Sequence, residues 1–490
     1  MKVHRLAVAQ SPLKDKPPET LDVYGIRLLS AVLVSMLLLR PDAVALGVEA
    51  SSKPNLILVL ADDLGAPELG CYGNREFRTP NLDRMAAEGL RLDTFYATPL
   101  CTPTRVGLMT GQYGFRNGFL GMQDPRFRYG FNEPKGQIGA KFTLADLLKS
   151  GGYATAMAGK WQLSGRLPTL VRDCGFDEYR MWAYRDNLPE GVQHRGNWEG
   201  EPGSSNTSRS WYPSIVENGR YLPTKPDDYG PDLFLDFIVD FIRRHKDGPF
   251  FVYHTSVLTH APWTETPDPD HPGRRWPEGF KSNLEYLDHL MGRLRGKLEE
   301  MDLANRTVVF FVGDNGTGRR GKGTVTELGV RVPFVAWGPG WVKPMPGATR
   351  ALGDLTDILP TLADLSGTPL PKDTTFDGKS LGPLLRGETT THRQWIYSHL
   401  DDGRILRDAR WLLEIPKGGG NAKFTDCGES RDGTGYRDVS DSADAQVQAA
   451  RKRFAEILAQ MPEPKPRTDV SAPKKQGKKK RALSKKKTDG

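Results

Sequence analysis

Residues 96–113, YATPLCTPTRVGLMTGQY, place a cysteine beside prolines, threonines and an arginine, just ahead of a short apolar helical pattern. Thr102 is a candidate N-cap and Pro103 suits the first helical position, which predicts Cys101 at a helix N-terminus. There the helix dipole and free N–H groups stabilise developing negative charge. Arg105 adds a cation that binds oxyanions through two donors. The stretch indicates an anion-handling nucleophile site, and a buried structural cysteine is the alternative that it leaves open.

Acidic and amide side chains follow two of the predicted buried strands. Asp62 and Asp63 come directly after the first strand, and Asp314 and Asn315 directly follow a later one. Because ligands of open α/β sheets bind at the carboxyl ends of strands, we expect both clusters at one edge. Carboxylate and amide oxygens suit a hard cation, Ca²⁺ or Mg²⁺. Three crowded carboxylates would repel one another unless a cation held them, whereas loop capping could explain the first pair alone.

Basic side chains are expected around the same edge. Lys160 follows a predicted strand at 153–159, His260 lies shortly after another, and Lys322 lies in the glycine-rich stretch GRRGKGTVTELGVRVP. Together with Arg105 and a divalent ion, they supply more positive charge than a neutral substrate needs. This surplus favours a multiply charged tetrahedral group, sulfate or phosphate, as the group transferred.

The elements that must position these residues alternate between strands and helices. Continuous apolar runs, typical of strands buried on both faces, occupy 56–60, 153–159, 249–256, 307–313 and 332–338. Helical patterns occupy 79–90, 143–152, 231–246 and 283–301. The alternation predicts an α/β fold with helices on both faces of an open sheet. Shorter pieces at 393–400 and 409–415, then a helical pattern at 444–460, predict a small C-terminal α+β unit.

The two ends of the chain differ in composition from its body. The apolar run 28–39, followed by small residues, is typical of a signal-peptide core and is short for a membrane span. We expect export to the periplasm or the medium and no transmembrane span in the mature chain; an uncleaved N-terminal anchor is the alternative. The predicted organisation is a leader at 1–50, a catalytic domain at 51–370, a subdomain at 371–462 and a basic disordered tail at 463–490.

The net charge of +8 comes from the tail. Residues 473–490 hold nine of the 68 Lys and Arg residues and one of the 60 Asp and Glu residues, which leaves 59 of each sign in the rest of the chain. The body therefore has no charge signature of nucleic-acid binding, and no nucleic-acid partner is expected. The tail is suited to an acidic polymer or membrane surface, or serves only solubility.

Six sequence blocks together resemble the sulfatase family. CTPTRVGLMTG resembles the family's C-x-P-x-R signature, and the other blocks follow in the family's order: LVLADDLG, GYATAMAGKW, VLTHAPW, FFVGDNG and GKGTVTELGVRVP. The resemblance runs from Pro54 to Gly387 and more loosely beyond. It implies an alkaline-phosphatase-like fold, with a mixed, mostly parallel sheet and a small C-terminal subdomain. The implied activity is hydrolysis of a sulfate monoester, either an aryl sulfate or a sulfated carbohydrate.

The resemblance also implies a modified residue. Cys101 would be oxidised to formylglycine by a formylglycine-generating enzyme that reads Pro103 and Arg105. One hydroxyl of the hydrated aldehyde, polarised by calcium, would attack sulfur, and the second would then expel sulfate.

The family's site residues carry over position by position. Asp62, Asp63, Asp314 and Asn315 resemble calcium ligands, with residue 101 as a further ligand and Ca²⁺ favoured over Mg²⁺. Arg105 resembles the residue that steadies formylglycine. The sulfate-binding group corresponds to Lys160, His260 and Lys322, of which His260 or Lys322 could protonate the leaving oxygen.

Two positions depart from the family's pattern. The family usually reads GKWH, whereas this chain has GKWQ, with Gln162 at the histidine. Glutamine hydrogen-bonds but takes no proton near neutral pH, so we predict slower sulfate release or another base from 164–173. Leu328 replaces the usual glycine and is expected to pack.

The substrate and the class of activity stay open at this point. The aromatic, polar stretch 186–228 is expected to be a long substrate-facing loop, compatible with a sulfated polysaccharide or a small aryl sulfate. The stretch and its flank carry Trp182, His194, Arg195, Trp198, Trp211 and Tyr212. A phosphonate or phosphate ester hydrolase of the same fold is one alternative. A non-catalytic binder of sulfated glycans, inactivated by Gln162, is another, and a cysteine phosphatase fits least because Cys101 and Arg105 are too close in sequence.

Overall fold

The computed structural model describes residues 53–121, 138, 141–163, 169, 171–183, 208–345 and 349–462. The chain divides into two units, residues 1–52 and 53–490, and every described residue belongs to the second. The predicted leader and basic tail lie outside the described residues, and the predicted domain boundaries remain predictions. Among the helices that the structure describes, none has the length and apolar character to cross a bilayer.

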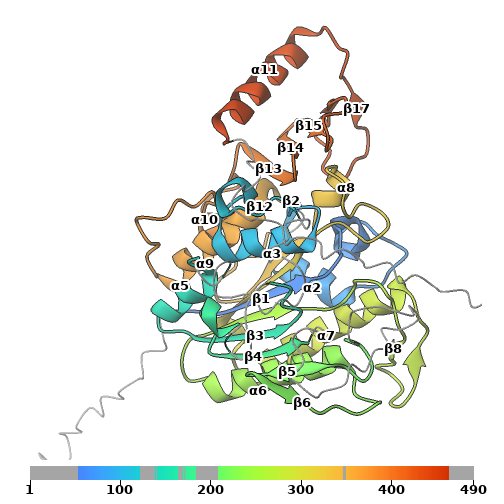
Figure 1. The fold of residues 1–490 in the computed structure, drawn as a ribbon, viewed down its shortest axis with the longest axis vertical. Helices are drawn as coiled ribbons and strands as arrows, with labels where there is room; N and C mark the ends of the chain where they lie inside the picture. Colours follow the sequence, from blue (N-terminus) through green and yellow to red (C-terminus); the bar gives the residue numbers. More distant parts are fainter. Residues whose placement is uncertain are drawn as a thin grey trace, which may run out of the picture. The chain divides into compact units, whose positions relative to one another are not determined.

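A mixed sheet forms the centre of the described unit (Figure 1). Its ten strands lie in the order β12 (Thr349–Asp354), β2 (Leu90–Tyr96), β11 (Phe334–Trp337), β10 (Thr307–Gly313), β1 (Asn55–Ala61), β7 (Phe250–Thr255), β3 (Ala154–Gly159), β4 (Glu178–Trp182), β5 (Ile215–Glu217) and β6 (Arg220–Leu222).

Most neighbouring strands of this sheet are parallel. The strands β10, β1, β7, β3 and β4 run in one direction, and β1 pairs with β10 from Asn55 opposite Thr307 to Ala61 opposite Gly313. Because β11 is antiparallel to both β10 and β2, β2 runs in the same direction as β1. The carboxyl ends of seven strands, β2 and β12 included, therefore face one edge of the sheet.

Helices cover both faces of the sheet because the side chains of each central strand alternate between two cores. Leu56, Leu58 and Leu60 pack with α3 (Cys101–Thr110), α5 (Leu144–Ser150) and α9 (Ile358–Ser366). Ile57 and Val59 face the core with α2 (Pro80–Glu88), α6 (Gly230–His245) and α7 (Phe280–Glu300). Each fully buried aliphatic side chain contributes about 1.5–3 kcal/mol. This two-sided burial explains why β1 reads as a continuous apolar run.

A second, antiparallel sheet follows in the C-terminal region. Its strands are β13 (Trp395–Leu400), β14 (Gly403–Asp408), β15 (Trp411–Ile415), β16 (Lys423–Asp426) and β17 (Arg437–Asp438). Helix α11 (Ala445–Gln460) packs on it through Phe454, whose ring meets Phe424 edge-on at 5.4 Å. The shorter elements are α4 (Gly114–Asn117), α8 (Glu327–Val330), α10 (Gly382–Leu385) and the pair β8 (Thr266–Pro267) and β9 (Arg275–Trp276).

The predicted fold class is confirmed, and one regional prediction is partly wrong. Residues 208–228, expected to be loop, contain β5 and β6, which extend the main sheet as a hairpin. The turn between them is Asn218–Gly219, where both residues have positive φ, as a two-residue hairpin turn requires. The rest of the expected loop, residues 186–207, lies outside the described residues.

Candidate active site

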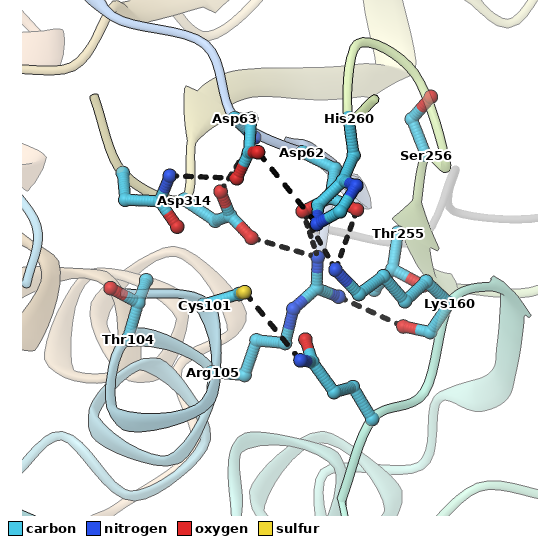
Figure 2. A network of polar contacts seen from close by, with 12 residues as sticks. Asp62, Asp63, Cys101, Thr104, Arg105, Lys160, Thr255, Ser256, His260 and Asp314 are labelled. Atoms are coloured by element: carbon cyan, nitrogen blue, oxygen red, sulfur yellow. Dashed lines mark hydrogen bonds and ion pairs between the residues drawn. The ribbon is translucent and has the colours of Figure 1, made fainter. Parts of the chain in front are cut away.

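The strand ends at one edge of the main sheet bring together the residues predicted for the site. Figure 2 shows Asp62, Asp63, Asp314, Cys101, Arg105, Lys160 and His260 there, and Lys322 joins them through its contact with Asp63. Asp62 and Asp63 follow β1, Asp314 and Asn315 follow β10, and Lys160 follows β3. The remaining members come from the start of α3 and from the segments after β7 and β10: Cys101, Arg105, His260 and Lys322. Parallel strand direction, rather than closeness in sequence, collects them.

Helix α3 places Cys101 at the site. The helix begins at Cys101, with Leu100 as its N-cap, so the predicted N-cap Thr102 is wrong by two residues. The N-terminal position is nevertheless confirmed, and the helix ends at Gly111, which adopts the left-handed conformation of a C-cap. Cys101 is buried, and burial raises the pKa of its thiol although Lys160 opposes the shift. An unmodified thiol at this position would stay protonated at neutral pH and be a weak nucleophile.

Three buried carboxylates surround this helix end. One oxygen each of Asp62 and Asp63 and the sulfur of Cys101 all lie within 4.8 Å of one another. Burial and the neighbouring Asp62 raise the pKa of Asp314 to about 7. Burial would also raise the pKa of Asp62, but Lys160 holds it well below its ordinary value. The cluster therefore carries negative charge that requires cations close by.

The donor atoms of this cluster fit a hard cation. Asn315 donates through Nδ2 to Asp63 Oδ1 and to the Gly316 carbonyl, each at 2.9 Å. Its Oδ1 is buried and accepts no hydrogen bond within the described part of the chain. A buried amide oxygen without a donor, beside three carboxylates, is the arrangement that a bound Ca²⁺ would satisfy.

The four basic residues of the site differ in how deeply they are buried and in which carboxylates they contact. Arg105 Nη2 lies 2.9 Å from Asp314 Oδ2 and 3.6 Å from Asp62 Oδ1, and its Nη1 donates to the Lys160 carbonyl at 2.8 Å. Lys160 Nζ contacts Asp62 Oδ2 at 2.6 Å. Lys322 Nζ contacts Asp63 Oδ1 at 2.6 Å and keeps 19% of its side-chain surface exposed. Arg105 and Lys160 are thus buried against carboxylates, whereas Lys322 and His260 are partly exposed and accessible to an anion.

His260 is held by an arginine that the sequence did not single out. Its Nε2 lies 3.7 Å from Asp63 Oδ2, and 27% of its side chain is exposed. Arg209 Nη2 donates to the carbonyls of His260 and Ala261 at 2.7 and 2.6 Å and lies 3.3 Å from His260 Nδ1. Burial lowers the pKa of His260 to about 4, so the imidazole is neutral at pH 7. The only sequence signal for Arg209 is its place in an aromatic, partly basic stretch.

Gln162, the residue at the family's histidine position, contacts Cys101. Its Nε2 lies 3.5 Å from the Cys101 sulfur, and its Oε1 is buried without a donor in the described residues. The backbone is left-handed, with φ +53, which is uncommon for a residue other than glycine. Gln162 thus keeps a hydrogen-bonding contact with Cys101 but offers it no titrating base.

The remaining residues named from the sequence are Leu328 and those of the aromatic stretch. Leu328, expected to pack, is 59% exposed, so that expectation is wrong: only its backbone is enclosed, with its carbonyl directly beside Gly316 and Gly321. Among the aromatic-stretch residues, Trp182 belongs to β4, and Trp211 and Tyr212 lie just before β5. His194, Arg195 and Trp198 lie outside the described residues.

Comparison with known proteins gives consistent matches. The Sulfatase family model matches residues 54–368. Arylsulfatase A of Bos taurus is 35% identical over 427 residues, covering 78% of this chain and 77% of its own. N-acetylgalactosamine-6-sulfatase of Canis lupus familiaris is 33% identical and covers 74% and 72%. The solved structure of a sulfatase from Pseudoalteromonas sp. shares the fold, with a TM-score of 0.66 at 22% identity over 89% of this chain and 94% of that one.

Proposed function

The chain belongs to the sulfatase family, whose reaction is sulfate ester hydrolysis, and we propose that Cys101 and the charged side chains around it carry out this reaction on a sulfate monoester. One observation carries the proposal. Cys101, three buried carboxylates and the donorless oxygen of Asn315 meet at the same strand edge as Lys160, His260 and Lys322.

Each residue has a role that follows from its contacts. A Ca²⁺ ion held by Asp62, Asp63, Asp314 and Asn315, with formylglycine at position 101, would supply an activated oxygen nucleophile for attack on sulfur. Lys160 and Lys322 bind the sulfate oxygens and neutralise the charge that develops on them. Burial opposes a raised pKa at Lys322, but the neighbouring carboxylates of Asp63 and Asp62 raise it. Its Nζ therefore stays protonated and can hold a proton near the leaving oxygen.

The substrate proposed is an aryl sulfate or a sulfated carbohydrate. Support comes from the relatives, which are named for activity on aryl sulfates and on N-acetylgalactosamine 6-sulfate. We also propose export to the periplasm or the medium, on the apolar run at 28–39. N-terminal sequencing of protein recovered outside the cytoplasm would test it, and an intact leader on cytoplasmic protein would contradict it.

The test is hydrolysis of para-nitrophenyl sulfate beside para-nitrophenyl phosphate, by protein matured in a host that makes formylglycine. We expect release of nitrophenol from the sulfate ester, loss of activity with a calcium chelator and recovery with added Ca²⁺. Preference for the phosphate ester would favour phosphoryl transfer on the same fold. Binding of sulfated glycans without turnover of either ester would favour a non-catalytic binder, the reading that Gln162 supports.

A further inference from the structure

Arg319 lies in the segment that joins the proposed metal ligands after β10 to Lys322. A Cβ added to the preceding residue, Gly318, would lie 3.3 Å from Asp63 Oδ2. Arg319 itself is exposed. Arg319 is thus an exposed residue that directly follows a glycine bordering the carboxylate cluster of the active site.

Arg319 lies in a turn, and its backbone has a left-handed conformation. Its φ is +66, in the left-handed region where side chains cost on the order of 1 kcal/mol or more. Glycine would adopt this conformation freely, and Gly323 in the same segment does so at φ +83. Arginine at this position therefore carries an energetic cost that glycine would avoid.

An aromatic ring tied to the active site holds that side chain. The guanidinium carbon lies 5.1 Å from the ring centre of Trp263. Trp263 donates through Nε1 to the Thr259 carbonyl at 2.8 Å, and the Thr259 amide donates to the Asp62 carbonyl at 2.7 Å. Phe280 packs against Trp263 edge-on at 5.6 Å. The cation–π contact therefore fixes Arg319 relative to the carboxylate cluster.

The charge of Arg319 is uncompensated, unlike that of its neighbours. Arg320 pairs with Glu68 at 2.9 Å, and Arg275 pairs with Glu265 at 3.3 Å. Within the described residues, Arg319 has no carboxylate at ion-pair distance. An exposed, oriented guanidinium without an acidic partner is ready to bind an anion with two parallel donors.

We propose that Arg319, held on Trp263, binds a second anionic group of the substrate, a sulfate or carboxylate beside the scissile sulfate. The inference rests on the proposed sulfate ester hydrolysis and narrows its substrate class. The substrates are polyanionic saccharide sulfates rather than aryl sulfates with an uncharged leaving group.

The test measures selectivity in the Arg319→Gln variant. The reporter is para-nitrophenyl sulfate, and a heparin-derived tetrasaccharide serves as a polyanionic competitive inhibitor. Because a charge-assisted contact is lost, we expect the ratio of the inhibitor's Ki to the reporter's KM to rise on the order of 10- to 100-fold. Arg319→Lys keeps the charge but loses the planar stacked donor pair. Its ratio of Ki to KM should lie between those of the wild type and Arg319→Gln.

Arg275→Gln is the matched control. It also removes an arginine stacked on a tryptophan, since Arg275 lies 3.8 Å from the ring centre of Trp211, but one whose charge Glu265 neutralises. An unchanged ratio in Arg319→Gln, an equal rise in the control, or no inhibition of the wild type would each overturn the inference. The proposed function would fail if the wild type released sulfate from neither the reporter nor the tetrasaccharide. Calorimetric binding of the tetrasaccharide to the wild type, Arg319→Gln and Arg275→Gln would then still decide the role of Arg319.

Discussion

The active site and the contact between the end of β12 and the C-terminal region both bury charged side chains, yet they are built differently. We call the second group the junction cluster: Tyr113, Asp354, Asp357 and Arg393. Asp354 accepts from the Thr356 amide at 3.0 Å and from the Tyr113 hydroxyl at 2.6 Å. Asp357 accepts from the Asp354 amide at 3.0 Å and from Arg393 Nε at 2.9 Å.

The two clusters differ in whether they contain buried oxygen acceptors that receive no hydrogen bond. The carboxylates do not differ, because every carboxylate oxygen of either cluster receives a donor from the chain itself. In the active site, Asn315 Oδ1 and Gln162 Oε1 receive none within the described residues, and Lys322 and His260 are partly exposed. Buried charge alone therefore does not mark a functional site, whereas unsatisfied acceptors beside accessible cations do.

The largest predicted effect separates the clusters by activity. Cys101→Ala should lower kcat on the order of 10⁴-fold or more, because the side chain that becomes the nucleophile is gone. The variant should unfold at nearly the wild-type temperature. Steady-state kinetics and calorimetric melting of the same preparation measure both quantities. Residual activity within tenfold of wild type would contradict a nucleophilic role for residue 101.

The matching variant in the junction cluster is Asp357→Asn. It leaves the Arg393 guanidinium, whose side chain is only 5% exposed, without its closest carboxylate. Breaking a buried pair in this way should lower the free energy of unfolding by about 3–5 kcal/mol. Urea unfolding measures this loss, and kcat per folded molecule should stay within twofold. A large fall in kcat with unchanged stability would contradict a structural role for the cluster.

Ca²⁺ affinity should distinguish the two clusters, because only the active site contains the Asn315 Oδ1 acceptor that lacks a donor in the described part of the chain. Asn315→Ala removes that acceptor and should weaken Ca²⁺ binding on the order of 10- to 100-fold, while Asp357→Asn should leave it unchanged. Isothermal titration of chelated protein with Ca²⁺ gives both values. Equal affinities for wild type and Asn315→Ala would remove Asn315 from the ligand set.

A smaller effect is expected at Gln162. Gln162→His places a titrating imidazole beside Cys101 at a left-handed position that histidine tolerates better than most residues. If sulfate release limits turnover, kcat should rise about tenfold, a small part of the roughly 10²- to 10⁴-fold that a well-placed general base supplies. Pre-steady-state measurements of nitrophenol release should show a burst in the wild type that shrinks in the variant. A lower kcat with the burst unchanged would show that glutamine already suits the step.

The smallest effect concerns acid stability of the junction cluster. Burial alone would raise the pKa of Asp357, but Arg393 lowers it to about 2. The ordinary pKa of aspartate in an unfolded chain is about 3.9. A lowered folded-state pKa contributes stability that is present above pH 4 and lost as the pH falls toward 2. Asp357→Asn should make the unfolding free energy fall less steeply with pH across that window. Urea unfolding at several pH values measures this slope, and a slope equal to that of the wild type would show that Asp357 plays no part.

The sequence predicts the active site better than it predicts the edges of the fold. Asp62, Asp314 and Lys160 follow apolar runs that are buried on both faces, so the strand ends that carry them were recognisable. The strands β2 and β12 were missed because their alternating or polar sequences lack such a run. Arg209 was missed because it acts through backbone carbonyls of another segment, a contact that only the fold creates. Leu328 was misjudged because only its backbone, not its side chain, is enclosed.

The central claim is that residue 101 becomes an aldehyde within a sulfatase site. Peptide mass spectrometry of the fragment containing residue 101, from protein purified out of its native host, tests it most directly. We expect a fragment mass in which CHO replaces CH₂SH, together with turnover of para-nitrophenyl sulfate by that sample. A fully unmodified cysteine, under conditions where the host's maturation enzyme is active, would contradict the hydrolytic mechanism.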